Sequence, residues 1–108
     1  MVQNEQMVEL ARVQVHVRPD YAGIVPGFIR NRHVDVAASR TELQAGDFDS
    51  IRVRGHNMAG CGGALGFPTI TEIGRALELA ARSMDSAGIE ACVRRLADYL
   101  DKIEVVYG

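Results

Sequence analysis

The stretch Phe48–Gly66 reads Phe-Asp-Ser-Ile-Arg-Val-Arg-Gly-His-Asn-Met-Ala-Gly-Cys-Gly-Gly-Ala-Leu-Gly. Its small and apolar residues recur every three or four positions, the period of one face of a helix; they are Phe48, Ile51, Gly55, Met58, Gly62 and Leu65. Yet five glycines fall within residues 55–66, and a glycine inside a helix costs about 1 kcal/mol relative to alanine. Because local rules are most often broken at functional sites, we look for function at His56 and its small neighbours.

Three further segments have the helical period. Their apolar positions are Val25, Phe28, Ile29, Val36 and Leu43; Ile70, Ile73, Leu77, Ala80 and Met84; and Ile89, Val93, Leu96, Leu100 and Ile103. Gly46 and Asp47 are predicted to link the first two helices, because glycine is typical of a helix end and aspartate of an N-cap. Phe67-Pro68-Thr69 and residues 85–88 mark the next two turns. Residues 104–107 extend the last helix or form a tail.

Four amphipathic helices with short links favour an all-α fold, an antiparallel up-down four-helix bundle. Val13–Val17 alternates with period two, which predicts a short strand or extended arm that Pro19 ends. We therefore expect an N-terminal arm over residues 1–19 and a single bundle domain over residues 20–108. His33 and Asp35, on the first helix, are expected on a solvated face.

Length and composition exclude several classes of function. A chain of 108 residues with 24% charged residues is typical of one globular domain. Its net charge of -2 gives no field that favours nucleic acid. No apolar run reaches the roughly 18 residues of a membrane span, and Glu5 and Glu9 precede any apolar stretch, so we expect a cytoplasmic protein without a signal peptide. Cys61 and Cys92 lie in no metal-binding spacing and are predicted to be buried free thiols, and we expect no metal or cofactor on this chain.

His56 lies off the buried face of its helix. It is about 100° around the helix from Gly55, so it is at least partly exposed. Its own row of neighbours consists of Asp49, Arg52, Ala59, Gly60 and Gly63. Gly55 and Gly62 fall on the buried face and are assigned to packing, whereas Gly60 and Gly63 would let a partner approach the imidazole. Position alone is equally compatible with a surface histidine that has no role.

Other chemistries fit this stretch less well. A Walker loop needs a lysine after its second glycine, and no lysine follows any glycine here. In a Gly-x-Gly-x-x-Gly motif starting at Gly60, Leu65 occupies the place of the last glycine. Cys61 faces a different side of the helix from His56, so the two cannot form a nucleophilic pair.

The pattern resembles the histidine-containing phosphotransfer (HPt) domain of two-component phosphorelays. That family has a His-x-x-Lys-Gly motif, then small residues and a second glycine ten positions after the histidine. His56, Gly60 and Gly66 match, as does Leu77-Glu78 on the following helix. Ile24–Arg32 and Gly55-His-Asn-Met also look like a bacterial subgroup of stand-alone HPt proteins. The resemblance covers residues 20 to about 106.

The resemblance implies that His56 accepts a phosphoryl group from a receiver-domain aspartate or from a histidine kinase and passes it on. Arg52, Ala59, Gly60 and Gly63 would form the surface around the phosphohistidine and the docked receiver. The receiver would supply Mg²⁺, so the chain would be a phosphohistidine carrier rather than a self-sufficient enzyme. Neither nucleic acid nor a membrane is expected as a partner.

One departure from the family motif concerns Ala59, which stands where the family has a lysine beside the phosphoryl group. Arg52, one turn before His56, could supply a substitute charge, and Arg75 is a weaker candidate. The departure motivates a second hypothesis, a degenerate binding module that docks receiver or kinase domains without phosphotransfer. A third is a dimerisation domain held by apolar residues of Val13–Val17 or Val105–Tyr107.

Overall fold

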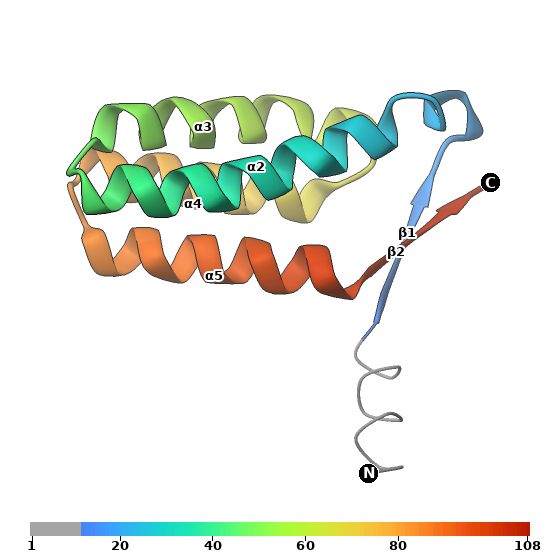
Figure 1. The fold of residues 1–108 in the computed structure, drawn as a ribbon. Helices are drawn as coiled ribbons and strands as arrows, with labels where there is room; N and C mark the ends of the chain where they lie inside the picture. The colour runs from blue at the N-terminus through green and yellow to red at the C-terminus, as the bar shows by residue number, and fades with distance from the viewer. Residues whose placement is uncertain (1–11) are drawn as a thin grey trace, which may run out of the picture.

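Four helices lie side by side in alternating directions (Figure 1). The computed structural model describes residues 12–108. Its long helices are α2 (Val25–Gln44), α3 (Phe48–Cys61), α4 (Pro68–Arg82) and α5 (Ser86–Lys102). They confirm the predicted antiparallel four-helix bundle. No helix within residues 12–108 is long and apolar enough to cross a lipid bilayer.

The turns between the helices follow the predicted chemistry. The Asp47 side chain accepts a hydrogen bond from the Ser50 amide at 3.1 Å and so caps α3. The Ser50 hydroxyl also donates to Asp47, and these two bonds hold the pKa of Asp47 below its ordinary value. Asp85 caps α5 in the same way through the Gly88 amide. Gly46 has a φ of +69°, which glycine adopts without strain.

Helix α3 ends at Cys61, earlier than the sequence periodicity predicts. Residues Gly63–Leu65 form a short 3₁₀ turn, η2, and Gly66 follows with a φ of +96°. This left-handed residue turns the chain toward α4, so Leu65 is not part of the helix that carries His56. The prediction that α3 continues through Leu65 was wrong. Small residues at helical spacing extend the periodic pattern, but glycines are common where a helix ends.

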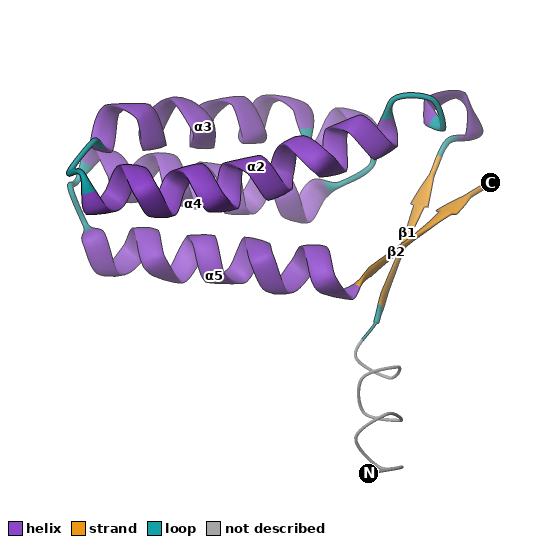
Figure 2. Ribbon diagram, in the orientation of Figure 1, coloured by secondary structure: helices purple, strands orange, loops and turns teal. Residues whose placement is uncertain are grey.

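Two short strands form a parallel pair beside the ends of α2 and α5 (Figure 2). Strand β1 (Val13–Val17) is the predicted strand, and β2 (Ile103–Tyr107) pairs with it in the register Val13 to Ile103. Ile103 was predicted to belong to the last helix, and residues 104–107 were predicted to extend that helix or to form a tail. They form a strand because β1 offers backbone partners to a segment rich in β-branched residues. The first eleven residues of the predicted arm lie outside the described residues.

Strand β1 joins the core of the bundle through alternate residues. Val15 and Val17 are buried, whereas His16 between them is exposed. A short 3₁₀ turn, η1 (Pro19–Tyr21), then leads into α2. Gly66 lies against the strand, since a Cβ atom on it would stand 3.5 Å from the His16 carbonyl oxygen. The sheet therefore packs close to the turn that follows α3.

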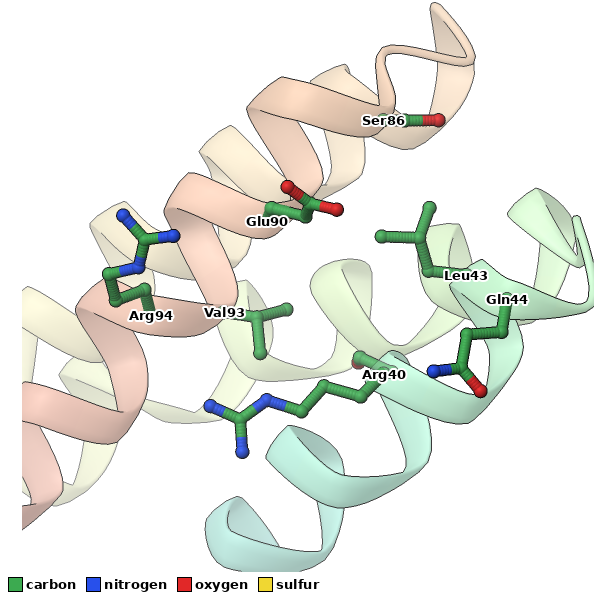
Figure 3. A pocket seen from close by; sticks show the side chains of 8 residues that line it. Arg40, Leu43, Gln44, Ser86, Glu90, Val93 and Arg94 are labelled. Carbon is green, nitrogen blue, oxygen red and sulfur yellow. The ribbon is translucent and has the colours of Figure 1, made fainter.

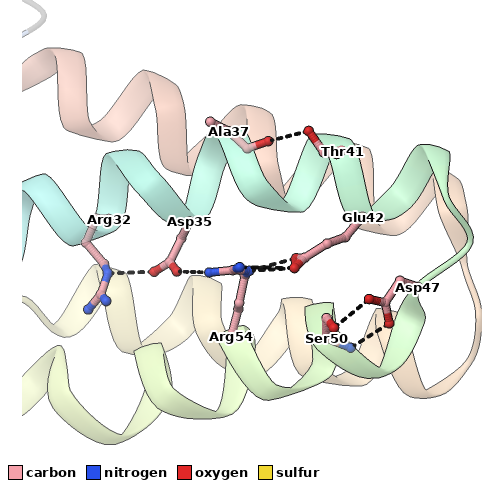
Figure 4. Close-up of polar contacts among 8 residues, drawn as sticks. All are labelled: Arg32, Asp35, Ala37, Thr41, Glu42, Asp47, Ser50 and Arg54. Atoms are coloured by element: carbon pink, nitrogen blue, oxygen red, sulfur yellow. Dashed lines mark hydrogen bonds and ion pairs between the residues drawn. The ribbon is translucent and has the colours of Figure 1, made fainter.

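A row of charged side chains joins α2 to α3 (Figure 4). Asp35 pairs with Arg32 at 2.8 Å within α2 and with Arg54 of α3 at 3.1 Å. Arg54 also contacts Glu42 at 2.7 Å, and these hydrogen bonds with Glu42 raise the pKa of Arg54. The expectation that Asp35 lies on a solvated face was wrong, because it is only 7% exposed and has cations on both sides. His33 is exposed, as predicted.

Helices α3 and α4 approach each other backbone to backbone. A Cβ atom on Gly55 would lie 2.6 Å from the Glu78 amide nitrogen and 2.8 Å from the Gly74 carbonyl oxygen. A Cβ atom on Gly74 would lie 2.6 Å from the Ala59 amide nitrogen. Gly62 meets the backbone of α4 equally closely, so the packing role predicted for Gly55 and Gly62 is confirmed. Gly60, in contrast, has open space where a side chain would be.

This difference predicts opposite effects for two alanine substitutions on α3. Gly55→Ala should lower the free energy of unfolding by about 2 kcal/mol, since its methyl group would overlap immobile backbone atoms. Gly60→Ala should leave stability unchanged or raise it by up to about 1 kcal/mol, because alanine restricts the unfolded chain and meets nothing in the folded one. Urea unfolding followed by circular dichroism measures both values, and equal effects would contradict the packing described here.

Candidate functional site

His56 stands on the outer face of α3 beside α4. Its side chain is 71% exposed, which agrees with the prediction that it lies off the core. Ile51, Gly55 and Met58 form the buried face of the same helix. An imidazole presented on a rigid helix, with its ring in solvent, is accessible to a second molecule.

Glu78 of α4 contacts the imidazole. Its Oε2 atom lies 3.3 Å from Nδ1 of His56 and 3.0 Å from Nη2 of Arg82, one turn further along α4. The Glu78 side chain is only 16% exposed, so neighbouring atoms hold it in place. Sequence reasoning did not place Glu78 and Arg82 in the site, although the Leu77-Glu78 match was the signal that could have found Glu78.

The contact with Glu78 selects one form of the neutral imidazole. A carboxylate accepts hydrogen bonds and does not donate them, so in a neutral ring this contact favours the tautomer whose proton is on Nδ1 of His56. Nε2 then has a free lone pair, because a neutral imidazole has one donor nitrogen and one acceptor nitrogen. The site therefore offers an oriented nitrogen nucleophile.

Small residues surround His56 on the side toward the end of α3. Gly60 is exposed and has nothing within 4 Å of the position that a Cβ atom would occupy. Gly63 lies in η2, where its amide donates a 2.8 Å hydrogen bond to Thr71 Oγ1. The Thr71 hydroxyl in turn donates to the Ala59 carbonyl at 3.1 Å. Thr71, which sequence reasoning missed, thus fixes the end of α3 against α4.

The cations near His56 differ in their partners. Arg52 is bound to Asp49 through two hydrogen bonds, of 2.9 and 3.2 Å. Arg82 is bound to Glu78. Arg75 is exposed, and among residues 12–108 it has no hydrogen-bond or ion-pair partner.

His56 does not line any of three grooves on the surface, although one between α2 and α3 is lined by its neighbour Asn57. A groove of about 490 Å³ lies between α2 and α5 and is lined by residues such as Arg40, Leu43, Glu90 and Arg94 (Figure 3). None of its lining residues belongs to the surface around His56. Within the described part of the chain, no cluster of three His, Cys, Asp or Glu side chains could hold a metal ion. The candidate site is thus an open helical face rather than a cavity.

A family model matches most of the chain. The Hpt domain family model matches residues 27–105, from the first turn of α2 into β2. No curated protein and no solved structure matches the chain. The matched range contains His56, Glu78 and the residues that surround them.

Proposed function

The chain belongs to the Hpt domain family, whose members carry out histidine phosphotransfer in phosphorelays, and on this premise we propose that His56 is the phosphoacceptor. The observation that carries the proposal is the hydrogen bond between Nδ1 of His56 and Glu78 on an exposed helical face. It directs a free imidazole nitrogen into solvent, where a partner domain can reach it.

The proposed reaction is a direct transfer between two side chains. Nε2 of His56 attacks the phosphorus of a receiver's aspartyl phosphate, and an N–P bond forms as the P–O bond breaks. The bonding electron pair stays on the receiver's carboxylate. Because Nδ1 keeps its proton, the product ring is a phosphorylated imidazolium, and the Glu78 carboxylate stabilises its positive charge.

The partner supplies the remaining chemistry. Hpt domains generally interact with receiver domains and kinases, and we expect the receiver to hold the Mg²⁺ that neutralises the transferred phosphoryl group. This chain contributes the nucleophile and the docking surface. That surface comprises His56, Arg52, Ala59, Gly60 and Gly63, with the neighbouring part of α4. The protein is then a phosphohistidine carrier rather than a self-sufficient enzyme.

Removing the nucleophile tests the proposal directly. The protein is incubated with a panel of receiver domains charged by acetyl phosphate, and bound phosphate is tested for acid lability and base stability. His56→Gln should abolish this label, while His33→Gln, a change at an exposed histidine of α2, should retain it. Label that persists in His56→Gln would remove His56 from its proposed role.

The role of Glu78 predicts a rate effect. Glu78→Gln keeps the shape of the side chain but removes the charge that stabilises the product ring. Phosphorylation should slow about fivefold, which corresponds to roughly 1 kcal/mol of transition-state stabilisation. Glu90→Gln, at an exposed position of α5, is the matched control and should leave the rate unchanged. Equal rates for wild type and Glu78→Gln would show that the carboxylate does not assist the reaction.

The open space at Gly60 predicts a steric effect. Gly60→Leu would place a bulky side chain one turn after His56, where, apart from the adjoining backbone of α3, no atom of residues 12–108 lies within 4 Å of the Cβ position. The rate of phosphotransfer from a phosphorylated receiver should fall at least tenfold, while the helical content and the melting temperature remain those of the wild type. Ala91→Leu, at an exposed position of α5, serves as the control. A folded Gly60→Leu protein that is phosphorylated at the normal rate would contradict the proposed docking surface.

A second candidate function is favoured by Ala59. Because this residue brings no cation to the site, the chain could dock a receiver or kinase domain without accepting phosphate. This candidate predicts that His56→Gln binds the partner as well as the wild type does, and that the wild type forms no phosphohistidine. Measuring partner affinity and label in the same preparation separates the two functions.

A further inference from the structure

We propose that Arg75 supplies the cation that contacts the phosphoryl group on His56. This inference rests on the proposed phosphotransfer and names a further residue for it. It reverses the order of preference in the sequence analysis, which ranked Arg52 above Arg75. Three observations carry it: the position of Arg75 on α4, the closeness of α3 and α4, and the different partners of the nearby arginines.

The contacts on either side of Arg75 determine its position. Thr71, four residues before it, binds the Ala59 carbonyl, and Glu78, three residues after it, contacts His56. Residues three and four apart lie on the same face of a helix, so Thr71, Arg75 and Glu78 form one row. Thr71 contacts α3 at Ala59 and Glu78 contacts it at His56, so Arg75 lies between these two contact points along α4. Ala59, the position of the family's lysine, is one of these two contact points.

The distance between the helices is small at this level. Gly74, the neighbour of Arg75, packs against the backbone of Gly55 and Ala59, so that even a methyl group would not fit between them. Arg75 itself is exposed and stands on the outer side of this contact. A long side chain on α4 can therefore extend across the outer face of α3 to a group carried by His56.

The other two arginines are each paired with a carboxylate, Arg52 with Asp49 and Arg82 with Glu78, the residue that also contacts His56. Asp49 holds Arg52 at 2.9 Å and Glu78 holds Arg82 at 3.0 Å, and each carboxylate offsets the charge of its partner. Within residues 12–108 Arg75 has no such partner. Its guanidinium is available for the phosphoryl oxygens, where a planar pair of N–H groups binds two oxygens at once.

The chemistry of the transfer gives this cation its effect. Negative charge is spread over the three equatorial oxygens of the phosphoryl group as the N–P bond forms and the P–O bond breaks. The electron pair of the breaking P–O bond stays on the receiver's carboxylate, beside the receiver's Mg²⁺. Arg75 therefore does not stabilise the leaving group. The guanidinium stabilises the phosphoryl oxygens both in the transition state and in the phosphohistidine product.

Phosphoramidate tests this proposal without a receiver domain. It donates a phosphoryl group to histidine with loss of ammonia, and phosphorus NMR follows both formation and hydrolysis of the phosphohistidine. Arg75→Gln should form phosphohistidine about fivefold more slowly, the factor expected for about 1 kcal/mol at an exposed site. The difference should shrink in 1 M NaCl, because salt screens exposed charges. Arg75→Lys should retain most of the rate, and Arg94→Gln on α5 is the matched control.

A double variant distinguishes a charge effect from a structural one. Ala59→Lys added to Arg75→Gln should restore the rate, because it returns a cation to the position used by the family. The proposal is overturned if Arg75→Gln reacts at the wild-type rate, if Arg52→Gln causes the larger loss, or if lysine at position 59 fails to rescue. A wild-type protein that takes no phosphate on His56 would instead refute the proposed function itself.

Discussion

The contact of α3 with α4 at Gly55 and Gly74 is the constraint on which the site depends. Two helices can come this close only where neither carries a side chain at the contact. The close approach sets the Glu78 carboxylate against His56 and lets the Thr71 hydroxyl reach the end of α3. A larger separation would leave the imidazole without its orienting partner. Gly55 of α3 thus serves the chemistry through packing rather than through flexibility.

A different interaction joins α2 to α3. Asp35 lies between one arginine of its own helix and one of α3, and Arg54 also reaches Glu42. Ion pairs at low exposure are costly to separate, since each charge would remain without a partner. A shift of α2 along α3 would break several of these pairs together. The charges therefore fix the longitudinal position of the two helices, while the apolar core holds them in contact.

Hydrophobic period and turn chemistry were sufficient to predict the bundle, because each helix buries one face and Asp47 marks a cap by its local chemistry alone. They did not predict β2, since its partner strand lies far away in the sequence and no local pattern reports that pairing. Asp35 was misplaced for a similar reason: its partner Arg54 lies on another helix. Exposure of His56 followed from its position on the helix, whereas the contact with Glu78 depends on how α3 and α4 are aligned.

The pairing of β1 with β2 has a consequence for the order of folding. The register joins Val13 to Ile103, so all four helices lie in the connection between the two strands. Parallel strands always need such a crossover, and here the crossover is the bundle itself. During synthesis β1 has no partner until the ribosome has released residues 103–107, whereas the helices form from neighbours in sequence. We therefore expect the sheet to be the last element to form, and Val15 and Val17 to reach their buried positions late.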